Sequence, residues 1–272
     1  MAIITVSRGS FSGGKSLAEC VASKLGFSCI SREALVDEAV KRYEVPEEKL
    51  RDALTKKPGL LDHLTREKSH YLMCLRAALI RMVKDERAVY HGHAGHLLLR
   101  GIPHLVRVRV IASMEFRTRA VMDSQHVGRK EAVEYIENVD KERSKWTEFL
   151  YHEDWNDPSQ YDIVLNIDQL GILDTCEVVC RAAAMEQYKT TQESQKVLDD
   201  LALSTEVRGV IACDAARKGV ADAGVEIEAD NGIITISGTA ASLEDADRIR
   251  DMTASVPGVR AVNSKIEVWP HW

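Results

Sequence analysis

The octapeptide Gly9-Ser10-Phe11-Ser12-Gly13-Gly14-Lys15-Ser16 reads G-x-x-x-x-G-K-S, the pattern of a phosphate-binding loop, or P-loop. Glycines let such a loop curl tightly enough to aim several backbone N–H groups at phosphate oxygens. We expect all eight residues to bind a nucleotide, with Lys15 as a catalytic cation on the β- and γ-phosphates and the Ser16 hydroxyl as a ligand of Mg²⁺. The alternative is a glycine-rich turn that binds nothing.

The sequence on either side of the loop has the order that this motif requires. Residues 2–6 form a short apolar, β-branched run suited to a buried parallel strand, and residues 17–25 form a helical pattern that Gly26 ends. Strand, loop and helix therefore follow one another. The start of the helix adds its positive dipole end to the loop.

The alternation of strand and helix continues beyond this first unit. Alternating elements favour a parallel sheet with helices on both faces. We predict an α/β P-loop fold of three layers, α/β/α, around a five-stranded parallel sheet. The further strands are predicted at 27–30, 88–90, 106–111 and 161–165, and the helices at 32–43, 47–54, 63–87, 115–123 and from about 130 to 150.

The last part of the chain follows a different pattern. Residues 187–196 are polar and lack periodicity, which indicates a helix tail or a linker, and we place the domain boundary there, between residues 1–190 and 197–272. Asn231-Gly232 predicts a two-residue hairpin between two alternating strands. A capped helix and a final strand follow, so the tail is expected to be a small α+β module in α-β-β-α-β order.

The charge balance argues against a general nucleic-acid or membrane-surface binder. The net charge is −6, the pI is near 5.9, and residues 197–272 carry all of the excess, with 7 Lys and Arg against 13 Asp and Glu. We therefore expect no DNA or RNA partner and no membrane partner. The tail is expected to have a ligand or protein partner of unknown kind.

The cysteines show no C-x-x-C pair and no zinc-like spacing with the nine histidines, so they are interpreted as reduced thiols. Cys176 and Cys180 lie one helical turn apart and are interpreted as buried apolar residues in preference to a redox or metal pair. No run of 18 apolar residues occurs, and the P-loop begins before a signal-peptide core could form, so the cytoplasm is the expected location.

Five stretches carry a family resemblance: I-T-V-S-R-G-S-F-S-G-G-K-S at 4–16, G-x-x-x-x-L-L at 92–98, A-S-M-E-F-R at 112–117, I-x-x-x-D-K-E-R at 136–143 and D-W-N-D-P-x-x-Y-D-I-V-L-N at 154–166. Through them, residues 1–185 resemble the cytidylate kinase-like family of P-loop kinases. In the tail, N-G-I-I-T-I-S-G-T at 231–239 and V-P-G-V-R-A-V at 256–262 resemble a BON domain.

The resemblance implies transfer of the γ-phosphoryl group of ATP, with Mg²⁺, to the phosphate of CMP or dCMP. Such chemistry needs positive charge around the transferred group and two reactants held in line. The resemblance assigns Arg143 to the phosphates, as a catalytic and substrate-binding residue, with Asp140 on the same helix face. Arg117 is a further catalytic candidate. Arg32 is either a ligand of the acceptor phosphate or a surface charge.

Two positions depart from the family pattern. His93 stands where the family has an acceptor-site arginine, and Ile136 stands where close cytidylate kinases have a lid arginine. We keep His93 as a candidate substrate-binding residue. His91, His93 and His96 are interpreted as a packed loop trio, with part of a metal site as the alternative. The third strand carries no acidic residue, so Mg²⁺ is expected to depend on Ser16, phosphates and water.

The departures at the acceptor site leave two other functions open. One is a nucleotide-binding sensor with little turnover, in which the acidic tail recognises a partner or ligand. The other is a kinase that acts on a different small phosphate acceptor.

Overall fold

The computed structural model describes residues 2–55, 67–84, 87–218 and 224–268. These residues form two compact units. The first holds residues 2–34, 55 and 87–190, and the second holds residues 35–54, 67–84, 191–218 and 224–268. Helix α2 (Arg32–Tyr43) starts in the first unit and continues in the second.

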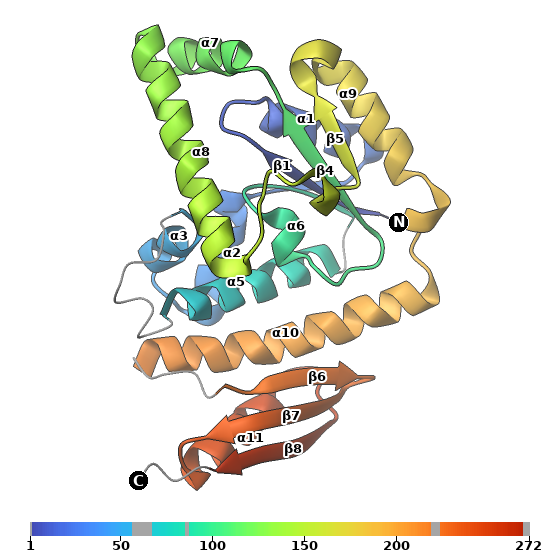
Figure 1. The fold of residues 1–272 in the computed structure, drawn as a ribbon. Helices are drawn as coiled ribbons and strands as arrows, with labels where there is room; N and C mark the ends of the chain where they lie inside the picture. The colour runs from blue at the N-terminus through green and yellow to red at the C-terminus, as the bar shows by residue number, and fades with distance from the viewer. Residues whose placement is uncertain (1, 56–66, 85–86, 219–223, 269–272) are drawn as a thin grey trace. The chain divides into compact units, whose positions relative to one another are not determined.

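The first unit is built on a parallel sheet (Figure 1). Its spatial order is β2-β3-β1-β4-β5, and every neighbouring pair is parallel, which confirms the predicted five-stranded parallel sheet. The strands are β1 (Ile3–Arg8), β2 (Ser28–Ser31), β3 (Ala88–His91), β4 (Leu105–Ile111) and β5 (Ile163–Asn166).

Helices cover both faces of this sheet because side chains alternate along each strand. Ile4 and Val6 of β1 face a core shared with α1 (Gly14–Leu25) and α9 (Ile167–Ala183). On the other face, the Ser7 hydroxyl lies 3.0 Å from His96 Nδ1 in the short helix α6 (Gly95–Leu98). The predicted three-layer arrangement is therefore confirmed.

Local chemistry sets the ends of the helices that carry the site. Helix α1 ends at Gly26, whose positive φ of 66° suits a glycine, as the sequence predicts. The Ser113 side chain accepts a hydrogen bond from the Phe116 N–H and so caps α7 (Met114–Gln125). A two-residue interval then leads to Gly128, the residue before the 23-residue helix α8 (Arg129–Tyr151).

The second unit combines a helix pair with a small mixed sheet. Helix α10 (Gln192–Lys218) packs along α5 (Glu67–Lys84), and Arg42 of α2 pairs with Glu206 of α10; the unit also holds α3 (Glu47–Thr55). The sheet consists of β6 (Glu226–Asp230), β7 (Ile233–Ala240) and β8 (Ala261–Val268), with β6–β7 antiparallel and β7–β8 parallel.

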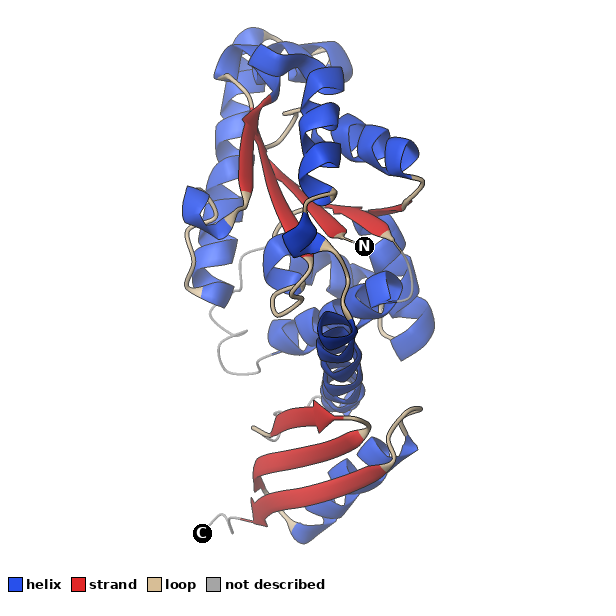
Figure 2. Cartoon of the chain, turned by 90° about the vertical axis from the view of Figure 1, so that its right-hand side faces the viewer, coloured by secondary structure: helices blue, strands red, loops and turns tan. Residues whose placement is uncertain are grey.

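Helix α11 (Leu243–Ser255) covers one face of this sheet (Figure 2). Ile249 of α11 and Ile234 and Ile236 of β7 share a core with Val207 and Ile211 of α10. The order α10-β6-β7-α11-β8 confirms the predicted α-β-β-α-β module. The predicted helix over 63–87 appears as α5 over 67–84, and residues 63–66 and 85–86 lie outside the described residues.

The polar stretch 187–196 is helical from Gln192 onward. Thr191 and Ser194 exchange hydrogen bonds, each hydroxyl accepting from the other residue's N–H at 3.1 and 2.9 Å, which starts the helix. Because α10 belongs to one unit with α5, the division into domains 1–190 and 197–272 stays a prediction.

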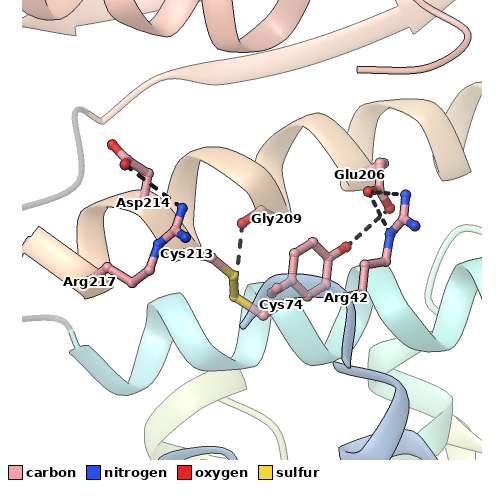
Figure 3. Close-up of a disulfide and its surroundings, with 8 residues drawn as sticks. Arg42, Cys74, Glu206, Gly209, Cys213, Asp214 and Arg217 are labelled. Atoms are coloured by element: carbon pink, nitrogen blue, oxygen red, sulfur yellow. Dashed lines mark hydrogen bonds and ion pairs between the residues drawn. A yellow bond between two sulfur atoms is a disulfide. The ribbon is translucent and has the colours of Figure 1, made fainter. Parts of the chain in front are cut away.

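A disulfide joins Cys74 of α5 to Cys213 of α10, with Cα atoms 6.4 Å apart (Figure 3). The interpretation of all six cysteines as reduced thiols is therefore wrong for this pair. Helical packing brings together residues 139 apart in sequence, which no local spacing indicates. Cys20, Cys29, Cys176 and Cys180 are free. Among the helices that the structure describes, none has both the length and the apolar character needed to cross a bilayer.

Candidate functional site

The loop between β1 and α1 depends on glycine at two positions. Gly13 has a φ of 75°, in the left-handed region that other residues rarely adopt. A Cβ at Gly14 would lie 2.3 Å from Arg8 Cδ, so a side chain there would displace Arg8. The Ser12 hydroxyl donates to the Gly9 carbonyl at 3.0 Å and closes the loop on itself.

Lys15 and Ser16 lie in the first turn of α1, and both are exposed. The Lys15 side chain is 66% exposed and contacts only Glu19 as an ion pair among the described residues, at 3.8 Å. No side chain caps α1, so the first N–H groups of the helix have no partner within it. N–H groups without a partner in the helix, a helix dipole and an exposed ammonium group together suit an anionic ligand.

Arg117 of α7 connects the loop to α8. Its Nε donates to the Ser10 carbonyl at 2.8 Å, and its Nη2 donates to Asp140 Oδ2 at 2.6 Å. The Ser10 hydroxyl donates to Asp140 Oδ1 at 3.0 Å, which closes a network of three residues. Three residues that the sequence selected separately therefore come together, and the Arg117 guanidinium is fixed at the edge of the loop.

Arg143 of α8 reaches the other end of the loop. Its Nη1 donates to the Arg8 carbonyl at 3.1 Å. Burial, followed by the positive charge of Arg8, lowers the Arg143 pKa to about 10, and Arg32 and Arg117 act in the same direction. The guanidinium stays protonated at neutral pH, because its pKa remains well above 7.

Arg8 completes a concentration of positive charge, which we call the arginine cluster: Arg8, Arg32, Arg117 and Arg143. Burial, and then the charge of Arg32, lower the Arg8 pKa. Among the described residues, the buried Arg8 Nε has no hydrogen-bond partner. Arg32 pairs with Glu33 at 3.0 Å, and Arg117 pairs with Asp140. Two carboxylates thus face four guanidinium groups, and the excess positive charge favours an anion.

Ile136 lies in a small apolar cluster. It is fully buried with Val121 and Ala132, where α7 meets α8, and Phe11 of the loop packs against them. The Phe11 ring also meets Tyr135 edge-on, with centroids 6.1 Å apart. The apolar residue at 136 therefore serves contact between the loop and the helix pair. Phe11, predicted to bind nucleotide, directs its side chain into this cluster.

His93 lies between two tryptophans. Its ring centroid is 4.9 Å from Trp146 and 5.5 Å from Trp155, and its Nε2 lies 3.2 Å from the Thr147 hydroxyl. Burial and the nearby Arg143 charge hold its pKa well below the usual value, so the ring is neutral. A neutral ring keeps one N–H donor but brings no positive charge to this position.

The other two histidines of the trio have separate partners. His96 lies between Ser7 and Gln160, with Nε2 3.1 Å from Gln160 Oε1, and burial lowers its pKa to about 4. His91 is buried at the end of β3, and burial lowers its pKa as well. Within the described parts of the chain, no group of three or more His, Cys, Asp or Glu side chains is placed to hold a metal ion.

A cleft of about 330 Å³ lies beside the loop and brings in residues that the sequence analysis missed. Arg109 of β4 lines it, with its guanidinium 4.5 Å from the Trp155 ring centroid. Arg109 Nη2 donates to Asn156 Oδ1 at 2.8 Å, and Nη1 donates to the Trp155 carbonyl. An arginine within the apolar run Val106–Ile111 was the available signal, since such a residue needs partners when buried.

A model of the cytidylate kinase-like family matches residues 3–169, and a BON domain model matches residues 199–270. A search of curated proteins found no match.

One solved structure shares the fold at low sequence identity, and a second is reported as a weaker likeness. An uncharacterized protein from Eubacterium ventriosum matches with a TM-score of 0.53 and 20% identity, over 67% of this chain and 97% of that chain. A shikimate kinase from Bacteroides thetaiotaomicron matches with a TM-score of 0.43 and 13% identity, over 68% and 99%. With the family match over more than half of the chain and an intact P-loop, this protein belongs to the cytidylate kinase-like family of P-loop kinases and carries a BON domain after its kinase region.

Proposed function

We propose that this P-loop kinase transfers the γ-phosphoryl group of ATP to the phosphate of a nucleoside monophosphate, CMP or dCMP. The arginine cluster beside the P-loop carries the proposal. A phosphoryl group in transfer spreads negative charge over its equatorial oxygens, and preorganised guanidinium groups stabilise that charge without reorganisation. The cytidine base is the suggestion of the family description, because no contact in the structure selects a base.

The residues present fit ATP with Mg²⁺. The uncapped start of α1, the glycines at 13 and 14 and the exposed Lys15 ammonium offer N–H donors and charge to phosphate oxygens. When bound, Mg²⁺ neutralises part of the negative charge of the phosphates. Ser16 is the protein ligand proposed for it, and phosphate oxygens and water complete its shell.

Each remaining side chain has a proposed role. Lys15 and Arg143 contact the transferred group, and Arg117 holds the loop against α8 while adding charge at its edge. Arg32 binds the acceptor phosphate from the start of α2. Asp140 orients Arg117 through the 2.6 Å contact between Asp140 Oδ2 and Arg117 Nη2. His93 contributes a packed neutral surface to the acceptor side.

We place this activity in the cytoplasm, where ATP is available to a kinase. The Cys74–Cys213 disulfide is unusual for that compartment. Its two residues are 0% and 2% exposed, and exchange with cellular thiols needs access to the sulfur atoms. We further propose that residues 1–190 and 197–272 correspond to the kinase and BON parts of the chain.

A coupled assay of ATP consumption against the common nucleoside monophosphates tests the proposal. We expect turnover that is highest with CMP or dCMP and requires Mg²⁺. Lys15→Ala should remove most of the turnover or ATP affinity while the protein stays folded, because Lys15 is exposed and contributes nothing to the core. Lys130→Ala is a matched control, since this lysine is 92% exposed on α8.

The two other functions give different results in the same assay. Tight ATP binding in calorimetry without turnover on any acceptor would identify a sensor. Turnover only with acceptors other than nucleoside monophosphates would support a kinase activity and reject the proposed substrate class. ATP binding that Lys15→Ala leaves unchanged would reject the P-loop site itself.

A further inference from the structure

The second unit contains a groove of about 690 Å³, which we call the α10 groove. Helices α5 and α10 form its walls, and the turns at 231–232 and 257–258, which precede β7 and β8, lie along its edge. Its volume is within the range of sites that hold small molecules. The P-loop and the arginine cluster contribute nothing to it, so any ligand here occupies a second site.

Basic residues outnumber acidic ones along this groove. Five basic side chains line it, against three acidic ones. The basic residues are Arg42, Arg81, Lys84, Lys196 and Arg260, and the acidic residues are Asp199, Asp200 and Glu206.

The acidic residues are engaged in holding the walls together. Asp199 pairs with Lys84 at 3.4 Å, and Asp200 accepts from the Asn231 N–H at 2.8 Å. Glu206 accepts from Arg42 Nε at 2.8 Å and from the buried Tyr43 hydroxyl at 3.0 Å (Figure 3). These contacts fix α2, α5 and the hairpin turn to α10.

Two arginines of the groove keep their charge uncompensated. Within the described ranges of the chain, neither Arg81 nor Arg260 forms an ion pair with a carboxylate. The Arg260 N–H donates to the Gly232 carbonyl at 2.7 Å, and a Cβ at Gly232 would lie 3.0 Å from Arg260 Cγ and Cδ. Because Gly232 has no side chain, the aliphatic part of the Arg260 side chain packs directly against this turn.

From these observations we infer that the α10 groove binds a small, soluble, multiply charged phosphate compound. Guanidinium groups bind phosphate oxygens in pairs, which suits Arg81 and Arg260. No aromatic side chain lines the groove among the described residues, so a nucleobase would lack a stacking surface. Its apolar side chains are limited to Ala202, Leu203 and Pro257, which form too small a surface to bind an acyl chain.

Titration calorimetry with inorganic triphosphate at low salt tests the inference on the full chain. The Lys15→Ala variant removes the P-loop contribution and serves as the background. In that background we expect binding to persist and to weaken as salt rises. Adding Arg81→Ala and Arg260→Ala should weaken it by about tenfold or more, because two charged contacts to phosphate are lost.

A double variant of equal charge change, Arg250→Ala with Lys265→Ala, is the control. Both residues lie in the same unit but outside the groove, so affinity should match that of Lys15→Ala alone. Melting temperatures without ligand check that all variants are folded. Kinase turnover of Arg81→Ala/Arg260→Ala, measured with Lys15 intact, should equal that of the unmodified protein, which separates this test from that of the proposed function.

Three results would overturn the inference. One is loss of all triphosphate binding in Lys15→Ala, which would place the only site at the P-loop. Another is unchanged affinity in the Arg81/Arg260 double variant. The third is a protein that does not bind triphosphate but sediments with phosphatidylglycerol vesicles, provided that sedimentation is lost in the Arg81/Arg260 double variant. That result would identify a lipid headgroup as the ligand in place of a soluble compound.

Discussion

The two compact units of this protein differ in how many of their buried polar groups have hydrogen-bond partners. Among the described residues, most buried polar side-chain atoms without a hydrogen-bond partner belong to the first unit, including Arg8 Nε, His91 Nδ1 and Trp155 Nε1. In the second unit, the buried Tyr43 hydroxyl and Glu206 carboxylate are paired, and a disulfide joins α5 to α10.

This difference concerns the cost of burying polar groups in each unit. An unsatisfied buried polar group costs about 1–3 kcal/mol, and the cost is offset where a ligand supplies the missing partner. In the first unit such groups include Arg8 Nε, in the arginine cluster, and the indole nitrogen of Trp155, which lines the cleft beside the P-loop. In the second unit, paired polar groups and the disulfide hold the helices together, and the exposed Arg81 and Arg260 line the α10 groove.

The largest effect should come from removing the disulfide of the second unit. Cys74→Ser with Cys213→Ser should lower the free energy of unfolding by up to about 4–5 kcal/mol, because the link closes a loop with a sequence separation of 139. ATP binding should persist, since the P-loop belongs to the first unit. Urea unfolding and calorimetry measure the two quantities.

Two checks accompany this prediction. Cys29→Ser changes an exposed free thiol and should leave the free energy of unfolding unaltered. Thiol titration of the denatured, unreduced protein should count four reactive cysteines of six. A count of six would show that the second unit is not cross-linked and would remove that part of the comparison.

The next effect concerns the first unit and its preorganised charge. Arg143→Ala should lower kcat by roughly 10²–10³ with little change in the KM for ATP, because charge on the transferred group is greatest in the transition state. Arg143→Lys should not restore the rate, since an ammonium group cannot reproduce the guanidinium fork. Steady-state kinetics on both variants decide this, and unaltered rates would reduce Arg143 to a structural anchor of the Arg8 carbonyl.

A third effect tests whether the first unit's buried polar groups limit its stability in acid. The His96 pKa is about 4 when folded and near 6.5 when unfolded. As pH falls from 6.5 to 4, the unfolded chain binds a proton that the folded chain does not, so the free energy of unfolding falls by about 3 kcal/mol from this residue. Above pH 6.5 the residue has no such effect.

Urea unfolding between pH 4 and 7 measures this dependence. His96→Gln should flatten the slope in that window, whatever it does to the stability at pH 7. His126→Asn is the control because His126 is exposed and Asn tolerates its φ of 59°. An equal slope in His96→Gln and the unmodified protein would assign acid sensitivity to other groups.

The sequence was sufficient for the first unit's strands and for the chemistry of its loop. Apolar β-branched runs, a glycine motif and an Asn-Gly turn are local features, so the five parallel strands and the tail hairpin were predicted within a few residues. The Ser10–Arg117–Asp140 network joins positions that motifs had selected, and only its geometry was new.

Features that depend on distant packing could not be predicted. Cys74 and Cys213 meet because two long helices run side by side, and neither helix's sequence indicates its neighbour. Arg109 and Trp155 pair across 46 residues for the same reason. Ile136 departed from an expected charge pattern, and its place in an apolar cluster required the positions of Phe11 and Val121.

The smallest effect should come from a charged residue that only adjoins the site. Arg119 lies two residues after Arg117 on α7, but its side chain is 72% exposed and pairs with Glu115 one turn away at 3.1 Å. Such exposed pairs contribute at most a few tenths of a kcal/mol. Arg119→Ala should therefore change the free energy of unfolding by no more than that, and kcat by less than about twofold. Glu115 keeps a second partner in Arg129 at 2.7 Å, which limits the disturbance further. The kinetic assay proposed for Arg143 also measures kcat of Arg119→Ala. A tenfold loss of kcat in this variant would mean that burial and fixed hydrogen bonds do not distinguish the arginines proposed to act on phosphate.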